Sequence, residues 1–124
     1  MAAVIVFEYA ALRAVPRVER GECVNIGVVL YCQARDFLAV AVHVDAARLR
    51  VLDPDVDVEG VRAAALALQR TCEGEGPAGQ STLGQRFRWI VAPRSTVVQP
   101  GPAHSGLTAD PVPELDRLVT ALVR

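Results

Sequence analysis

The chain contains the stretch Arg13-Ala-Val-Pro16-Arg17-Val-Glu19-Arg20-Gly21-Glu22-Cys23-Val-Asn25-Ile-Gly27, which separates two almost wholly apolar segments. It carries five charged side chains together with a proline and two glycines. Because proline and glycine interrupt regular structure, the stretch predicts a polar turn that connects two strands. Polar turns that a rigid sheet holds in place are common functional sites.

The two apolar segments, residues 4–12 and 24–32, are rich in β-branched and aromatic side chains and are too short for typical helices. Each is therefore predicted to be a strand. A third strand at 37–44 follows a connection of hairpin length, which favours an antiparallel meander.

Strand alternation sorts the side chains of the second strand into two sets. One set is Val24, Ile26, Val28 and Leu30, and the other is Asn25, Gly27, Val29 and Tyr31. Because both sets are mostly apolar, we expect helices or another subunit to cover the second face of the sheet.

Three helices are predicted, each with an aspartate that can cap its first backbone N–H groups. They span residues 45–52, 57–73 and 111–123. A fourth strand is predicted at 95–99, whereas 87–91 fits either a helix or a strand.

Glycine and proline shape the remaining connections. They predict a flexible loop at 73–82 and an irregular but stiff path at 100–110. The elements together predict an α+β fold, in which an antiparallel sheet of about four strands packs against helices. At 124 residues the chain fits a single domain over residues 1–124.

The composition limits the classes of function. A net charge of −1 argues against nucleic-acid binding, and no apolar run reaches membrane-spanning length. All thirteen basic residues are arginine, a side chain suited to bidentate contacts with carboxylate or phosphate. The three cysteines are widely spaced, which favours a reducing cytoplasm over a disulfide scaffold or a metal site.

Two polar clusters supply the candidate ligand-binding residues. The first surrounds the turn and the second lies in and beside the fourth strand: Arg13, Arg17, Glu19, Arg20 and Asn25, then Arg94, Ser95, Thr96, Gln99 and His104. If the fourth strand pairs beside the first or the second, Arg94 and the Arg17 turn would converge on one anionic ligand. The alternative is that the charges of the turn pair with one another and with solvent.

Other chemistry has weaker support. Cys23, His104 and Glu22 could form a thiol nucleophile with its base, although a cysteine beside valine is more often a small buried hydrophobe. Neither a catalytic mechanism nor a cofactor or metal ion is predicted, and two distant histidines make a poor metal site. Glu8, within an apolar strand, is expected to pair with an arginine.

Several motifs resemble the bacterial family catalogued as domain of unknown function 3037. They occur in order along nearly the whole chain: Phe7-Glu-Tyr9-Ala, Arg13-x-Val-Pro16-Arg17-x-Glu19-Arg20-Gly21-Glu22, Asn25-Ile-Gly27, Phe87-Arg-Trp89, Ala92-Pro-Arg94-Ser95-Thr96-Val-Val-Gln99 and His104-Ser-Gly106-Leu-Thr108. The resemblance implies a short, soluble, single-domain bacterial protein, and proximity of its gene to genes for HipA-like kinases. The family often has an aromatic residue where this chain has Cys23, which weakens a thiol mechanism further.

Two functions from different classes follow as predictions. The first is an accessory module that binds a protein partner, such as a HipA-like kinase, through an edge strand or the polar turn, and that also forms a homodimer. The second is a small enzyme or binding domain for a phosphorylated or carboxylated ligand held by the arginine-rich turn.

Overall fold

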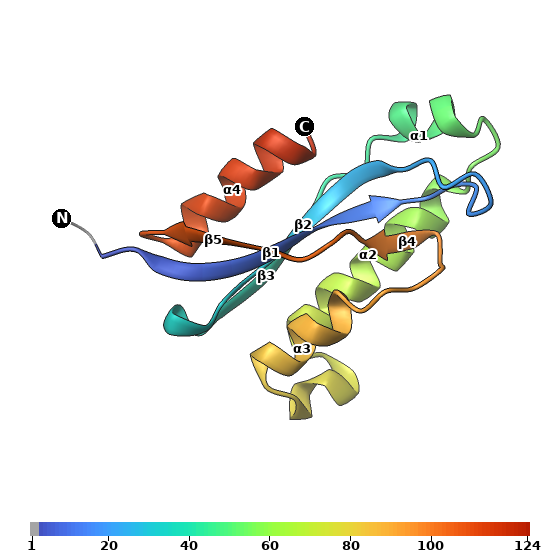
Figure 1. The fold of residues 1–124 in the computed structure, drawn as a ribbon. Coiled ribbons are helices and arrows are strands. Elements are labelled where there is room, and N and C mark those ends of the chain that lie inside the picture. The colour runs from blue at the N-terminus through green and yellow to red at the C-terminus, as the bar shows by residue number, and fades with distance from the viewer. Residues whose placement is uncertain (1–2) are drawn as a thin grey trace.

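Two long strands, β1 (Ile5–Ala14) and β2 (Val24–Cys32), form the centre of the sheet in this computed structural model, which describes residues 3–124 (Figure 1). β3 (Phe37–Val42) pairs with β2, so that the order is β3-β2-β1 with antiparallel neighbours throughout. The predicted meander is confirmed. The structure extends the first strand to Ala14 and ends the third at Val42.

The second edge of β1 carries an interrupted strand. Its near half is β4 (Val98–Pro100), which pairs with the end of β1, and its far half is β5 (His104–Thr108), which pairs with the start of β1. The predicted strand at 95–99 thus begins later, and the prediction of an irregular path over 100–110 is wrong for β5. Proline and glycine break the strand between the two halves, but a five-residue stretch of small and β-compatible side chains is enough to pair again.

Four α-helices complete the fold: α1 (Ala46–Leu52), α2 (Val58–Cys72), α3 (Leu83–Ile90) and α4 (Pro111–Leu122). The aspartates before α1, α2 and α4 accept hydrogen bonds from backbone N–H groups of the first turn, as predicted. The ambiguous segment 87–91 lies mostly in α3, which begins with a reciprocal capping box between Thr82 and Gln85.

Helices cover both faces of the sheet, as the two-sided apolar strands predict. α2 and α3 lie on one face and α4 lies on the other (Figure 1). On the α2–α3 side Phe87 is fully buried, and its ring stacks on Tyr31 with 5.4 Å between centroids. On the α4 side Leu118 packs against Phe7 and Leu30. Two cores therefore share one sheet.

A β-bulge in β2 changes the predicted sorting of its side chains. Leu12 pairs with Gly27 and Arg13 pairs with Asn25, so Ile26 is the extra residue on β2. Ile26 consequently lies in the α2–α3 core rather than with Val28 and Leu30 on the α4 side. The predicted grouping of these residues is wrong at this point, since one inserted residue shifts the alternation before it.

The outer edge of β3 is covered at its centre. Gln69 of α2 donates a hydrogen bond from Nε2 to the Val40 carbonyl oxygen, at 3.2 Å. This amide occupies the acceptor that a further strand would use.

Within the described residues, none of the helices is both apolar enough and long enough to span a membrane.

Candidate functional site

The charged turn predicted as a ligand site is dispersed over the surface. Arg17 is 3.4 Å from an Asp53 carboxylate oxygen, and Arg20 pairs with Glu22. Glu19 is exposed, like its neighbours in the turn. The pairing lowers the pKa of Glu22, because its carboxylate accepts a hydrogen bond from the Arg20 guanidinium and is attracted to its charge. Arg20 and Glu22 thus pair with each other, as the alternative from the sequence expects, whereas Arg17 pairs with Asp53 outside the turn.

Arg94 folds back over the C-terminal end of α3. Its Nε donates to the Ala92 carbonyl oxygen at 3.3 Å, and its Nη2 donates to the carbonyl oxygens of Trp89 and Ile90. Its guanidinium carbon also lies 4.7 Å from the centroid of the Trp89 ring. The guanidinium therefore binds carbonyl oxygens at the C-terminal end of α3 and holds the indole by a cation–π contact.

The neighbours of Arg94 mainly hold the backbone. The Thr96 hydroxyl donates to the Val98 carbonyl oxygen and the Gln99 side chain donates to the Thr96 carbonyl oxygen, both at 2.7 Å. Ser95 is exposed. These contacts fix the connection from α3 to β4 and thereby one wall of the hollow beside Trp89.

Trp89 separates two hollows on the surface of the α2–α3 layer. One has a volume of about 580 Å³ and is lined by Pro77, Ala78 and other residues, and the second, of about 420 Å³, is lined by Ala64, Val97 and others. Both are lined by Trp89 and Thr71, so they meet at these two side chains. We call the two hollows together the Trp89 groove.

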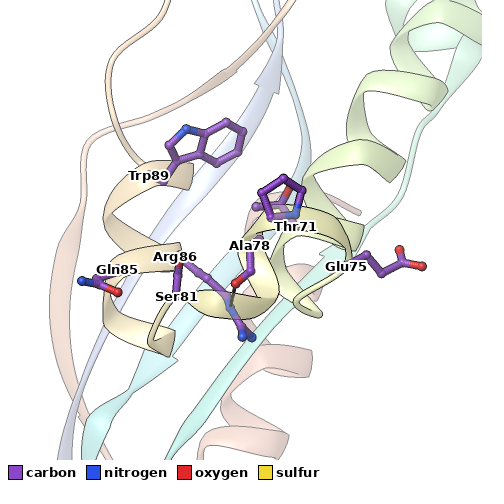
Figure 2. A pocket seen from close by; sticks show the side chains of 8 residues that line it. Thr71, Glu75, Ala78, Ser81, Gln85, Arg86 and Trp89 are labelled. Atoms are coloured by element: carbon purple, nitrogen blue, oxygen red, sulfur yellow. Dashed lines mark hydrogen bonds between the residues drawn. The ribbon is translucent and has the colours of Figure 1, made fainter.

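The lining of the Trp89 groove is mostly apolar, although Trp89 itself is 54% exposed. Figure 2 shows Trp89 projecting from α3 above the first hollow, while the Glu75 carboxylate turns away from it. Glu75 instead lies 3.6 Å from Arg70, at the rim. The groove is thus a concave apolar surface with one half-exposed aromatic side chain at its centre.

Arg86 secures the far wall of the first hollow. Its Nε donates to the Ala78 carbonyl oxygen at 2.9 Å (Figure 2). Its Nη1 donates to the Cys72 carbonyl oxygen at 3.5 Å. Gly74 has a φ of +83°, which favours glycine, and a Cβ there would lie 2.9 Å from the Arg86 guanidinium and displace it. The predicted loop at 73–82 contains the short 3₁₀ helix Gly76–Gln80; its flexibility stays a prediction.

Three of the predicted ligand-binding residues do come together, on the opposite side of the sheet. Arg13, Asn25 and His104 line a small hollow beside the end of α4. Arg94 lines the Trp89 groove instead, and Arg17 reaches Asp53. The structure therefore places Arg17 and Arg94 at different surface features, and the hypothesis that they converge on one ligand is not supported by these contacts.

The structure also gives the surroundings of Glu8 and of two cysteines, Cys23 and Cys72. Glu8 forms a bidentate ion pair with Arg88, with both N–O distances near 3 Å (3.0 and 3.1 Å), which matches the expected arginine partner. Cys23 is exposed, so the expectation that it is a small buried hydrophobe is wrong. Burial raises the pKa of the Cys72 thiol to about 11, which disfavours its thiolate form. Among residues 3–124, no three acidic, histidine or cysteine side chains are arranged to hold a metal ion.

Sequence reasoning missed Trp89 and Thr71. A signal for Trp89 exists, because it is the single tryptophan of the chain and lies between Phe87 and Ile90, both fully buried. In a helix, a residue between two inward positions three apart points outward. Thr71 carries no comparable signal, since its role depends on the packing of α3 beside α2.

The fold and the groove define a small α+β protein with helices on both faces of one antiparallel sheet. The chain belongs to the family described as protein of unknown function, DUF3037, whose model matches residues 9–123. No curated protein and no solved structure matches the chain. The family that the motifs resemble is thereby confirmed.

Proposed function

We propose that this protein is an interaction module that binds a segment of a partner protein in the Trp89 groove. The observation that carries the proposal is the position of Trp89, half exposed and held between two mostly apolar hollows. Exposed apolar surfaces rimmed by polar residues are candidate sites for binding another protein.

The groove has the side chains that dominate protein interfaces. Tryptophan and arginine are enriched among the residues that carry most binding free energy, and here Arg94 stacks on Trp89. Because the stacking and the carbonyl contacts of Arg94 hold the indole before binding, little side-chain entropy remains to be lost on association.

The shape and charge of the groove indicate the kind of segment that fits. Along one side runs α2, which presents the small side chains Ala64 and Ala67 and so lets another backbone approach closely. Arg94 has no carboxylate partner among the described residues. An amphipathic helix with an apolar face and a carboxylate that meets Arg94 is therefore the complementary partner. A HipA-like kinase as its source stays a prediction, as does a homodimer.

A selection from short random peptides displayed on phage tests the proposal, with the wild-type protein as bait and Trp89→Ala as the counter-selection. We expect enriched peptides that combine apolar residues at helical spacing with Asp or Glu. Because Trp89 is the single tryptophan, its emission reports occupancy directly and should shift to shorter wavelength as peptide excludes water.

Leu66→Ala is the matched control, since Leu66 is 43% exposed on α2 and lies outside the residues that line the groove. It should bind the enriched peptides as wild type does, whereas Arg94→Ala should bind them more weakly. Peptides without acidic residues, or binding that survives Trp89→Ala, would contradict the proposal. A dimer in light scattering that Trp89→Ala dissociates would show that a second copy, rather than a different protein, occupies the groove.

A further inference from the structure

A separate, smaller hollow lies on the α4 side of the sheet, on the opposite face from the two hollows of the Trp89 groove. Its volume is about 140 Å³, and Arg13, Asn25, His104, Tyr9 and Gly101 are among the residues that line it. Pockets for whole small molecules are usually larger, on the order of 300 Å³ or more. This hollow therefore suits a single chemical group rather than a complete nucleotide.

Arg13 enters this hollow with unused hydrogen-bonding capacity. Its Nε is buried and has no hydrogen-bond partner, alone among buried side-chain nitrogen and oxygen atoms of the described residues. Within residues 3–124 it also forms no salt bridge. A buried donor without a partner lowers the stability of the folded state, so native structures rarely keep one without a reason. A ligand oxygen that the guanidinium turned to meet would remove this cost.

Two irregularities of the sheet build the hollow around Arg13. The β-bulge at Ile26 places Asn25 directly across from Arg13, on the face that α4 covers. The break between β4 and β5 brings Gly101 over the guanidinium, and a Cβ at Gly101 would lie 2.9 Å from the Arg13 Cζ. The Gly101 N–H donates to the Ala11 carbonyl oxygen at 2.7 Å, which fixes this close approach. Bulges and strand breaks of this kind are frequent beside binding sites.

The end of α4 does not neutralise Arg13. The carbonyl oxygen of Leu122 in its last turn accepts a hydrogen bond from Asn25 Nδ2 at 3.0 Å. The amide of Asn25 thus uses this helix carbonyl, and the hydrogen bond orients the Asn25 side chain in the hollow. On the opposite side, the His104 ring rests against Tyr9, with 5.4 Å between centroids.

We propose that this hollow binds one carboxylate group of a small molecule or peptide, through the guanidinium fork of Arg13, with Asn25 and His104 beside it. One guanidinium balances the single charge of a carboxylate, and the planar fork matches its two oxygens. A phosphate carries more charge and usually draws on further donors, and the residues that line the hollow include no second arginine.

Nuclear magnetic resonance of the nitrogen-15-labelled protein tests this proposal, with sodium acetate as the probe and sodium chloride at equal ionic strength as the reference. We expect saturable changes at three signals: the Arg13 Nε–H, the Asn25 side-chain amide and the Gly101 backbone amide. Sodium phosphate is titrated separately. Saturation by acetate but not by chloride supports a carboxylate site, whereas tighter saturation by phosphate overturns this assignment.

Two variants separate recognition from folding. Arg13→Lys keeps the charge but removes the fork, and Gly101→Ala introduces a Cβ that displaces the guanidinium. We expect each to weaken acetate binding by about tenfold or more, while the other amide signals stay dispersed. Arg50→Lys is the control, because Arg50 is exposed on α1 and does not line the hollow.

Equal acetate affinity in wild type and Arg13→Lys, or identical linear shifts with acetate and chloride, would overturn the proposal. Because the Trp89 groove lies in the α2–α3 layer, failure here leaves the proposed function untouched, and failure of the peptide selection leaves this site untouched.

Discussion

Arginine side chains differ in their hydrogen bonding between the two sides of the sheet. On the α2–α3 side, Arg94 and Arg86 donate to backbone carbonyl oxygens and so hold the walls of an apolar groove. On the α4 side, Arg13 has a buried Nε without any partner. Arginine thus supports the backbone on one side, where Arg94 also faces the proposed peptide, whereas on the other side Arg13 keeps an unused donor. The exposure and charge of the side chains alone would not distinguish these roles, but the number of hydrogen-bond partners of each guanidinium does.

The largest expected effect concerns the support of the groove. Phe87→Ala removes a fully buried ring that stacks on Tyr31 and joins α3 to the sheet. We expect a loss of about 3–5 kcal/mol in the free energy of unfolding, measured by urea denaturation. Leu118→Ala on the α4 side is the matched comparison, and a larger loss there would mean that α3 is the less firmly attached layer.

Gly27→Ala tests the bulge on which the Arg13 hollow depends. A Cβ at this position would lie 2.6 Å from the backbone carbonyl oxygen of Ala41, which cannot rotate away as a side chain does. We expect a loss of about 1–3 kcal/mol, together with displaced signals from Asn25. Unchanged stability would indicate that the bulge relaxes easily and does not fix Asn25.

Replacing Arg94 and Arg13 by methionine, one at a time, compares their contributions to stability directly. Arg94→Met loses hydrogen bonds to the end of α3 and the contact with Trp89, so we expect a loss of about 1–2 kcal/mol. Arg13→Met removes an unsatisfied buried donor and should leave stability unchanged or raise it by about 1 kcal/mol. Thermal unfolding in chloride buffer measures both. Equal losses would erase the proposed difference between the two sides.

The smallest effect concerns the surface pair of Glu114 and Arg117. Hydrogen bonding to Arg117 lowers the pKa of Glu114 from its ordinary value of 4.5. The folded state therefore gains stability that is present above this value and lost as the pH falls through the lower, folded pKa. Because the Arg117 side chain is exposed, we expect Glu114→Gln to cost only about 0.3 kcal/mol at neutral pH and nothing in strong acid.

The sequence predicts the regular elements well because their signals are local. Periodic apolar residues and capping aspartates locate β2, α2 and α4 to within a few residues of their observed ends. It fails at Ile26 and at β5, since a bulge and a resumed strand depend on the register with β1. Local patterns do not encode pairing with a distant strand.

The candidate site is likewise only partly predictable from the sequence. Arg13, Asn25 and His104 are identifiable from the sequence as polar residues beside strands, but their grouping apart from Arg17 and Arg94 is not. The grouping requires the bulge and the break at Gly101, both of which arise from tertiary contacts. The outward direction of Trp89 follows from helical spacing once 87–90 is known to be a helix.

The amide of Gln69 on the Val40 carbonyl oxygen has a consequence for how this chain behaves in a crowded solution. A strand with an unpaired outer edge can form backbone hydrogen bonds with the same strand of a neighbouring molecule, and repeated pairing of this kind produces fibres. Here an incoming strand must first expel a side chain already seated in the hydrogen-bonding row. The helix that packs on the sheet thereby also terminates its growth, and discourages open-ended polymerisation along that border.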